Sequence, residues 1–374
     1  MVAQPPVRIP FLDLAAAHAE LAAEIEPAVL RVLRRGWYVL GPEVEAFEAE
    51  WAERVGVRHC VGVGNGLDGL RLSLEALGIG PGDEVIVPGH TYIATWFAVS
   101  GVGAVPVPVD VDGATYLIDV AAVEAAITPR TRAIIPVHLY GQPAAMVELL
   151  GIASRHGLAV VEDAAQAHGA SLDGIATGTQ GNCAAWSFYP VKNLGAAGDA
   201  GAVTTNDDAL ALRLRALRSQ GSLTRSAHEM VGWNSRLDEL QAAILRAKLG
   251  HLDEWNARRR SIAKRYLERL AGTTLGLPAV VPGASHVWHQ FVVRHPRRDS
   301  LRAALSAAGV ETLIHYETPP YRQAAYAHLG IAPGTLPCTD RLATEILSLP
   351  VDPLLVESRI DAVAAAITDW DRAL

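Results

Sequence analysis

The sequence predicts an α/β fold in which a mostly parallel sheet is flanked by helices, followed by a smaller C-terminal α+β domain. Between residues 42 and 205, short β-rich runs alternate with helical stretches, which is the pattern of a parallel sheet with helices on its faces. At 374 residues the chain is longer than one compact domain usually is, and half of its residues are hydrophobic, enough for a sizeable core. We therefore expect a large domain over residues 1–250, with the N-terminal segment included, and a small domain over residues 251–374.

The predicted elements of the large domain follow one another in a regular order. A helix over residues 42–55 precedes a short strand over residues 60–63, and five leucines between residues 67 and 77 fall largely on one face of a second helix. Further strands, several of them bounded by Gly or Pro, are expected at residues 85–89, 104–110, 132–138, 158–163, 184–188 and 201–205. Helices are expected between them at residues 91–101 and 144–157. Ligands of such sheets gather at the carboxyl ends of the strands, so residues just after a strand are candidate site residues.

The second part of the chain has a different pattern. Two long helices are predicted over residues 235–252 and 254–270. A segment rich in Gly and Pro follows, and then a β-rich run at residues 289–295, a helical stretch at 298–310 and a last helix near 357–370. This mixture predicts the α+β character of the small domain.

Charge and composition exclude several classes of function. The net charge of −8, without a block rich in Lys or Arg, argues against nucleic acid or a membrane surface as the main partner. No apolar stretch is long enough to cross a bilayer, and residues 1–14 lack the regions of a signal peptide, so we expect a cytoplasmic protein. The three cysteines lie far apart, which favours small core residues over a disulfide or a zinc site. His286 and His289 would point to opposite faces of a strand, so no metal site is expected there.

A glycine-rich turn, GNGLDG at residues 64–69, matches the pattern G-x-G-x-x-G. A dinucleotide-binding loop also needs an acidic residue at the end of the next strand, but Asp83 and Glu84 stand before that strand. A turn of this kind presents unpaired N–H groups at the positive end of a helix dipole, which suits any phosphate. Three interpretations therefore stay open: a dinucleotide site, a site for another phosphate, and a plain connection between strand and helix.

Lysine is scarce in this chain, and one lysine has unusual surroundings. Of the 32 Lys and Arg residues, only Lys192, Lys248 and Lys264 are lysines. Lys248 and Lys264 lie in strongly helical stretches, where a solvated position is expected. Lys192 follows an apolar run, in a stretch too rich in Gly and Pro to be helical. If it is buried, desolvation makes the neutral amine accessible near neutral pH, and this amine is a nucleophile toward carbonyls, which arginine cannot be.

Asp163 stands at the carboxyl end of an apolar strand, with Gln166 and His168 just beyond it. A carboxylate there lies where ligands gather, although taken alone its simpler role is the N-cap of a following helix. Together with Lys192 and the glycine-rich turn, Asp163 matches what pyridoxal phosphate requires. The lysine forms a Schiff base, the carboxylate keeps the pyridine nitrogen protonated, and N–H groups with a hydroxyl hold the phosphate.

Six segments, in order along the chain, resemble the DegT-type pyridoxal-phosphate-dependent nucleotide-sugar aminotransferases. They are DEVIVPGHTYIATWFAV, PVHLYGQPA, VEDAAQAHGA, SFYPVKNLGAAGDAGAV, GWNSRLDELQAAIL and LIHYETPPYRQAAY. The resemblance runs from about residue 11 to residue 355, and it is greatest to the aminotransferases of dTDP-linked 3-keto deoxysugars. It implies the aspartate-aminotransferase-like fold, which is fold type I of the pyridoxal-phosphate enzymes.

The resemblance also implies roles for residues around the cofactor. Lys192 would form the Schiff base and afterwards move a proton between substrate and cofactor. Asp163 would pair with the pyridine nitrogen, Gln166 would bond to the ring hydroxyl, and Tyr92 would stack on the ring. The residues implied at the phosphate are Asn65, Gly66, Leu67 and Ser187.

One further phosphate contact would come from a second subunit. The resemblance implies that Asn234 reaches the phosphate of the neighbouring chain, so that a homodimer with shared active sites is the functional unit. Taken by itself, Asn234 fits a helix N-cap equally well. The implied substrate contacts are Tyr189, His315, Tyr316 and Tyr321, although many relatives have histidine at the last of these positions.

The implied reaction is a transamination in two half-reactions. An amino acid, with L-glutamate expected, converts the cofactor to pyridoxamine phosphate, and a keto group on a nucleotide-linked deoxysugar then takes the nitrogen. The segments NGLDGL and SFYPVKNLGAAGDAG are similar to those of relatives that act at carbon 3, with dTDP as the expected nucleotide. The alternatives are amination at carbon 4 and dehydration of the sugar. In the dehydratases, however, histidine replaces the Schiff-base lysine.

Overall fold

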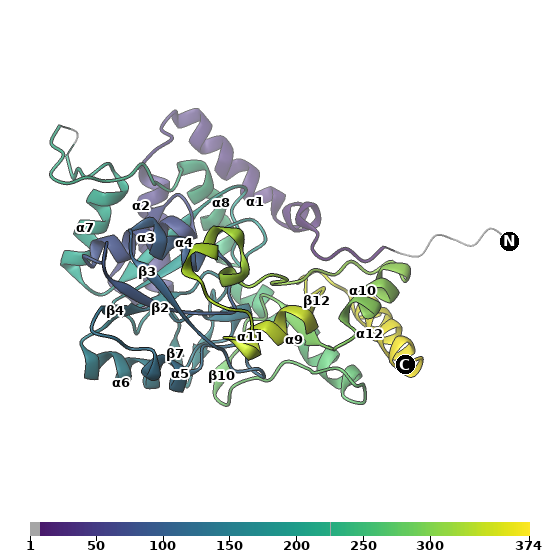
Figure 1. Cartoon of the computed structure of the whole chain (residues 1–374). Helices are drawn as coiled ribbons and strands as arrows, with labels where there is room; N and C mark the ends of the chain where they lie inside the picture. Colours follow the sequence, from purple (N-terminus) through teal and green to yellow (C-terminus); the bar gives the residue numbers. More distant parts are fainter. Residues whose placement is uncertain (1–7, 225) are drawn as a thin grey trace.

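The computed structural model describes residues 8–224 and 226–374. A large body is built on a seven-stranded sheet, and a second group of helices with a two-stranded sheet lies beside it (Figure 1). Residues 1–7, which hold half of the segment considered as a signal peptide and the start of the predicted large domain, lie outside the described residues. None of the described helices is both long and apolar enough to span a membrane.

The large sheet is mostly parallel, as predicted. Its strands are β1 (His59–Val63), β2 (Glu84–Pro88), β3 (Val105–Val109), β4 (Thr131–Ile134), β5 (Ala159–Asp163), β8 (Cys183–Ser187) and β9 (Gly201–Thr205). The spatial order is β1-β9-β8-β5-β4-β2-β3, and only β9 runs antiparallel to its two neighbours. β1 therefore points the same way as β5 and β8. The glycine-rich turn, Asp163 and Ser187 consequently follow or end strands at one edge of the sheet.

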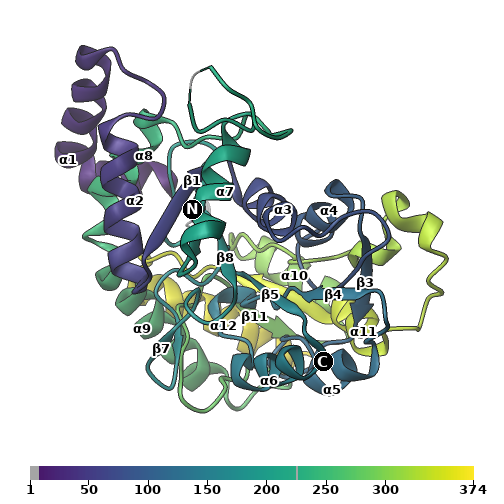
Figure 2. The same cartoon turned by 90° about the vertical axis from the view of Figure 1, so that its left-hand side faces the viewer.

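Helices cover both faces of this sheet (Figure 2). One layer contains α3 (Gly66–Ala76), α4 (Ala94–Gly101) and α7 (Asp208–Arg218), and the other contains α5 (Val120–Ala125) and α6 (Met146–His156). Alternate side chains of β2 pack against the two helical layers: Val85 and Val87 pack with α3, and Ile86 packs with α6. A strand buried on both faces reads as a continuous apolar run, which is how residues 85–87 were recognised as a strand.

Three helices pack beside the end of the sheet that holds β1. They are α1 (Leu14–Arg35), α2 (Pro42–Val55) and α8 (Glu239–Leu249). The buried carboxylate of Glu239, in the first turn of α8, accepts hydrogen bonds from the N–H groups of Gly41, Glu43 and Val44. These N–H groups lie at the start of α2, where helix geometry leaves them without intrahelical partners. α8 thus caps α2 and is held against the large body.

Most of the remaining residues form a second core. Its main elements are α9 (Leu252–Leu270), β11 (Phe291–Arg294), α10 (Arg298–Ala307), β12 (Ile346–Leu349) and α12 (Glu357–Arg372). α11 (Pro337–Glu345) lies beside this core, and its Leu342 is buried among residues from both halves of the chain. β11 and β12 pair antiparallel, and Tyr266, Phe291 and Ile367 are buried together between helices and strands. The α+β character expected for this half is therefore present. Ile9, from the segment assigned to the large domain, also packs into this core, so the limits of the two domains stay a prediction.

Several short elements complete the described chain. They are the strands β6 (Ser171–Leu172), β7 (Ile175–Ala176) and β10 (Ala284–Ser285), and the 3-10 helices η1 (Leu139–Gly141), η2 (Pro320–Arg322) and η3 (Ala324–Leu329). β6, β7 and β10 form a small sheet of their own. β10 ends at Ser285, so the segment with His286 and His289 is not the strand that the sequence predicted.

Candidate active site

A cavity of about 610 Å³ opens where β1, β5 and β8 end. It brings together most of the residues expected from the sequence. The predicted site residues that line it are Asn65, Gly66, Leu67, Tyr92, Asp163, Gln166, Ser187, Tyr189, Lys192, His315 and Tyr316. They come from both halves of the chain, because His315 and Tyr316 follow α10.

Lys192 lies in this cavity, in the connection between β8 and β9. Its backbone N–H donates to the Tyr189 carbonyl at 2.9 Å, so a tight turn carries the side chain. The side chain keeps some exposed surface because it lines the cavity, but its amine is surrounded by protein. Burial lowers the pKa of Lys192 to about 8, and the nearby carboxylate of Asp163 opposes this shift. A larger part of the amine is therefore neutral near pH 7 than in an ordinary lysine, as a carbonyl nucleophile requires.

Asp163 is buried at the end of β5 and faces the same cavity. Its carboxylate accepts a hydrogen bond from Thr95 Oγ1 at 2.9 Å and another from the N–H of Ala165 at 3.2 Å. Burial raises the pKa of Asp163, whereas these hydrogen bonds and the charge of Lys192 lower it. No α-helix begins at this point, so the N-cap interpretation does not describe Asp163. A cation placed beside the carboxylate would offset its desolvation.

Gln166 has an amide orientation that its hydrogen bonds determine. Its Oε1 accepts the backbone N–H of Tyr140 at 2.6 Å, so Nε2 is the atom that donates to the hydroxyl of Tyr316 at 2.9 Å. Tyr140 has a φ of 59°, a left-handed conformation that costs a bulky residue energy and is maintained here by its surroundings. The arrangement presents a hydrogen-bond donor to the cavity.

The turn after β1 leaves two N–H groups available for an anion. The first N–H groups of a helix have no intrahelical partner. In α3, Asn65 uses its side-chain oxygen for the N–H of Asp68 at 2.8 Å and its carbonyl for that of Gly69. The N–H groups of Gly66 and Leu67 remain. A Cβ on Gly66 would stand 2.8 Å from the Cβ of Ser187, so only glycine lets the helix start this close to β8.

This geometry decides among the three interpretations of the glycine-rich turn. It is more than a plain connection, because two N–H groups and the Ser187 hydroxyl line the cavity at a helix N-terminus. The strand that follows, β2, ends in Pro88 and carries no acidic residue at its carboxyl end. The turn therefore fits a phosphate that is not part of a dinucleotide. Lys192, Asp163, the Gln166 amide and this anion site together fit pyridoxal phosphate.

Three aromatic side chains and a histidine form the outer part of the cavity. Tyr92 is 55% exposed, and its ring centroid lies 5.4 Å from that of Tyr316. His315 is hydrogen-bonded through Nδ1 to Ser348 Oγ at 2.7 Å, and burial lowers its pKa to about 4. His315 is consequently neutral at physiological pH. Tyr189 is half exposed at the mouth.

Two predicted site residues do not line the cavity. Tyr321 is only 3% exposed, and its hydroxyl is bonded to the carboxylate of Asp340. It packs in the core of the large body, so the structure does not place it among the substrate contacts. Asn234 is exposed in the loop before α8, away from the cavity of its own subunit. It is not a helix N-cap either, because that position belongs to Asp238.

The structure adds residues that sequence reasoning missed. Thr95 and His289 line the cavity, and His289 Nδ1 is 3.2 Å from the side-chain oxygen of Asn193. Asn193 donates its Nδ2 to Asn256 and to the Val287 carbonyl, so its oxygen must accept from His289. The adjacency of Asn193 to Lys192 was the one signal in the sequence. No group of three potential metal ligands occurs among the described residues.

One expectation about the lysines is wrong. Lys248 is not solvated: its Nζ donates to the Gly195 carbonyl at 2.7 Å, and burial lowers its pKa. The helical pattern did identify its helix, but the face that carries Lys248 packs against the loop after Lys192. Lys264 is exposed, as expected.

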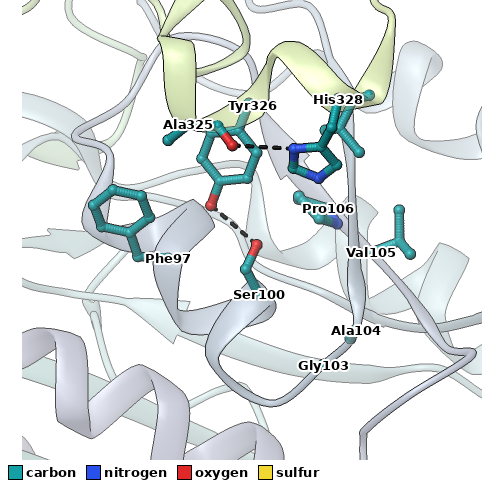
Figure 3. Close-up of a pocket in the computed structure, with 10 residues that line it drawn as sticks. Phe97, Ser100, Gly103, Ala104, Val105, Pro106, Ala325, Tyr326 and His328 are labelled. Carbon is teal, nitrogen blue, oxygen red and sulfur yellow. Dashed lines mark hydrogen bonds between the residues drawn. The ribbon is translucent and has the colours of Figure 1, made fainter.

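A second pocket, of about 360 Å³, lies beside the end of α4, the edge strand β3 and η3 (Figure 3). Phe97 lines both pockets. The hydroxyls of Ser100 and Tyr326 share a hydrogen bond of 3.1 Å, and His328 Nδ1 lies 3.1 Å from the Ala325 carbonyl (Figure 3). These polar groups are used within the protein. No predicted site residue lines this pocket, so we assign the chemistry to the larger cavity.

The mostly parallel sheet, the buried lysine and the strand-end carboxylate define a pyridoxal-phosphate enzyme of fold type I. The chain belongs to the DegT/DnrJ/EryC1/StrS aminotransferase family, whose model matches residues 19–368. The family, the fold and the cofactor implied by the resemblance are therefore confirmed, and the chain is an aminotransferase.

Similar proteins are known over the full length of this chain. It is 57% identical over 362 residues, covering 96% of this chain and 98% of the relative, to the erythromycin biosynthesis sensory transduction protein EryC1 of Saccharopolyspora erythraea. It is 54% identical over 364 residues, covering 97% and 96%, to dTDP-3-amino-3,4,6-trideoxy-alpha-D-glucose transaminase of Streptomyces venezuelae. The crystal structure of S. venezuelae DesV in complex with a ketimine intermediate matches with a TM-score of 0.97 and 53% identity, covering 99% and 100% of the two chains.

Proposed function

We propose that this enzyme transfers an amino group from L-glutamate to carbon 3 of a dTDP-linked keto deoxyhexose. The observation that carries the proposal is the buried amine of Lys192 beside the buried carboxylate of Asp163, at the strand ends of a type I fold. The 3-amino sugar is supported by a relative that is 54% identical and is named as a dTDP-3-amino-sugar transaminase. The motifs NGLDGL and SFYPVKNLGAAGDAG point the same way.

Pyridoxal phosphate, when bound, supplies a carbonyl for exchange of amino groups and a ring that withdraws electrons. In our proposal Lys192 attaches the cofactor through its amine and later carries the proton that must move at the reacting carbon. Asp163 would accept a hydrogen bond from the pyridine nitrogen, and Gln166 would donate Nε2 to the ring oxygen. Tyr92 would cover one face of the ring.

The phosphate is assigned to the start of α3. There the N–H groups of Gly66 and Leu67 and the hydroxyl of Ser187 would hold it, while Asn65 contributes the cap that fixes the turn. Such an anchor uses binding energy distant from the reacting carbon to orient the cofactor.

The sugar nucleotide is assigned to the outer part of the cavity. Tyr189, His315 and Tyr316 offer hydrogen-bonding groups there, and the neutral imidazole of His315 can accept from a sugar hydroxyl. Charged nucleotide sugars do not cross a bilayer unaided, so the proposal also places the enzyme in the cytoplasm.

We assign the active unit to a homodimer in which Asn234 completes the phosphate site of the neighbouring subunit. Described residues on either side of residue 225, between α7 and α8, stand away from the body of the molecule (Figures 1 and 2), and Asn234 belongs to the same connection, nearer to α8. In and near this connection and at the end of α1, large apolar side chains are exposed, which is common where another chain binds. They are Leu30, Leu33, Trp37, Tyr38, Leu223, Val231 and Trp233.

The proposal is tested first by trapping. We expect the purified protein with pyridoxal phosphate to show a visible absorption band that glutamate removes as the pyridoxamine form accumulates. Borohydride reduction of the glutamate-free sample should leave a pyridoxyl group on Lys192, and the scarcity of lysine makes the assignment by peptide mass unambiguous. A label on Lys248 or Lys264 instead would refute the assignment.

The acceptor is tested with the pyridoxamine form and two isomeric substrates. We expect nitrogen transfer to the dTDP-linked 3-keto sugar, with its turnover well above that of the 4-keto isomer. Preference for the 4-keto isomer would refute the position of amination, and a dehydrated product without nitrogen would refute transamination.

A further inference from the structure

The loop that follows Lys192 is fastened to helix α8. Residues 193–198 join Lys192 to Asp199, and both Lys192 and Asp199 line the active cavity. The Lys248 ammonium, near the end of α8, donates to the Gly195 carbonyl at 2.7 Å. Nearer the start of the same helix, Gln241 accepts the N–H of Ala197 at 2.8 Å. Two side chains of one helix therefore hold a loop that contains no regular structure.

Gly195, whose carbonyl accepts this hydrogen bond, is closely packed against the turn that carries Lys192. A Cβ at this position would stand 2.3 Å from the Pro190 carbonyl oxygen, so the loop folds tightly back on the turn that carries Lys192. A displacement of Gly195 therefore cannot be absorbed locally. It moves the turn of residues 189–192 or the segment leading to Asp199.

Lys248 is a partly buried lysine in the last turn of α8, and its recorded hydrogen-bond partner is a backbone carbonyl. None of the ion pairs within the described residues includes it, so its ammonium is desolvated without a carboxylate partner. Desolvation of a charged group is unfavourable. The presence of a partly buried lysine without an ion pair at this position therefore requires an explanation.

We propose that Lys248 is a positioning residue of the active site, whose hydrogen bond to Gly195 fixes the loop that places Lys192 and Asp199 in the cavity. The inference rests on the proposed role of Lys192. Lysine suits the position because a compact head with three donors reaches one carbonyl in a confined space, whereas guanidinium is a larger planar fork. This role also explains why position 248 is a lysine in a chain in which almost all of the 32 Lys and Arg residues are arginine.

The test compares Lys248→Met with Lys264→Met. Methionine keeps most of the length of the side chain and removes the donor, and Lys264 is an exposed helical lysine whose side chain is 80% exposed. Each variant is loaded with pyridoxal phosphate, and the visible spectrum is titrated with pH, followed by measurement of kcat and KM. The midpoint of the loaded enzyme belongs to the linkage between Lys192 and the cofactor and not to the free amine. Lys264→Met removes the same charge from an exposed site, so a midpoint that shifts only in Lys248→Met reports displacement of the loop.

We expect Lys248→Met to fold, to bind the cofactor, to shift the spectral midpoint and to lose about tenfold in kcat with less than about twofold change in KM. Lys264→Met should match the wild type. If Lys248→Met does not fold, Gln241→Met, which releases the same loop at Ala197, should show the same spectral shift. A wild-type midpoint and kcat in the folded variant would overturn the inference.

The wild-type spectrum separates this failure from failure of the proposed function. If the wild type itself shows no absorption band with pyridoxal phosphate, the assignment of Lys192 is refuted. If the wild type shows the band and the variants are indistinguishable from it, the cofactor role stands and only the positioning role of Lys248 is refuted.

Discussion

The reactive amine depends on two opposing effects within one pair of residues. Burial favours the neutral amine of Lys192, and the carboxylate of Asp163 favours the charged ammonium. Burial alone would lower the pKa further, and the carboxylate without burial would raise it. The result, about 8, leaves the lysine able to act as a nucleophile and to take up a proton again near neutral pH.

This balance makes a prediction for Asp163→Asn. Covalent attachment of pyridoxal phosphate to the cofactor-free wild type should speed up as pH rises through about 8, because the neutral amine reacts. The neutral amide of the variant lacks the charge that raises the lysine pKa, so the midpoint should move to lower pH. Turnover should fall on the order of a hundredfold or more, because the pyridine nitrogen loses its anionic partner.

Stopped-flow absorbance across a pH series measures the attachment, and steady-state assay measures the turnover. Thr95→Val is the matched control, since it removes one hydrogen bond to Asp163 and keeps the charge. A midpoint that stays at the wild-type pH in Asp163→Asn would mean that the carboxylate does not act on Lys192.

Side chains that accept hydrogen bonds from the free N–H groups at helix N-termini stabilise individual elements. Asn65 caps α3 and so defines the anion site, and Glu239 caps α2 from the first turn of α8.

At the free edge of the large sheet, β3 has the sequence VPVPV, and Val105 donates its N–H inward to the Asp83 carbonyl. Pro106 and Pro108 then fall on the outer side, where they remove donors that could pair with another strand.

The cap on α2 makes a prediction about stability. Glu239→Ala should leave the N–H groups of Gly41, Glu43 and Val44 without their acceptor, at a cost of about 2–4 kcal/mol in the free energy of unfolding. Urea denaturation followed by circular dichroism measures this. Glu254→Ala, which removes a 59% exposed side chain from the start of α9, should change stability by less than about 0.5 kcal/mol. Equal effects of the two changes would contradict the role of Glu239.

At the scale of whole molecules, the assignment of Asn234 predicts complementation between subunits. A heterodimer of one Lys192→Ala subunit and one Asn234→Ala subunit has one site with both defects and one intact site. We expect it to show about half of the wild-type activity, well above either homodimer. Coexpression with two affinity tags isolates the heterodimer. Activity equal to the mean of the two homodimers would show that Asn234 acts within its own subunit or not at all.

Prediction from sequence succeeded where local signals are strong. All six strands expected after residue 84 are present, because apolar runs bounded by Gly or Pro are distinctive. The helices α1, α5, α7 and α11 were not predicted. α5 is short, and α1 contains a proline at position 27, which is a signal against a helix in the sequence. The helix predicted from residue 235 begins at Glu239, because the backbone of Asp238 is extended and Ser235 is hydrogen-bonded to Asp68 of α3.

The order of residues along the chain is enough to identify the chemical groups of this protein. A lysine in an arginine-rich chain, a carboxylate at a strand end and a glycine turn before a helix specify reactive groups, and ordered motifs specify the family. These properties depend on residue type and on local spacing, which the chain carries in one dimension.

Which of these groups come into contact depends on the folded chain. It buried Lys248 against Gly195, removed Tyr321 from the cavity, oriented Gln166 through Tyr140 and brought His289 beside Asn193. Each of these outcomes depends on packing between segments far apart in the chain. The burial of a residue, and therefore the pKa of an amine, depends on the atoms around it. A periodic pattern in the sequence predicts that one face of a helix is buried, but it does not identify the atoms that bury it.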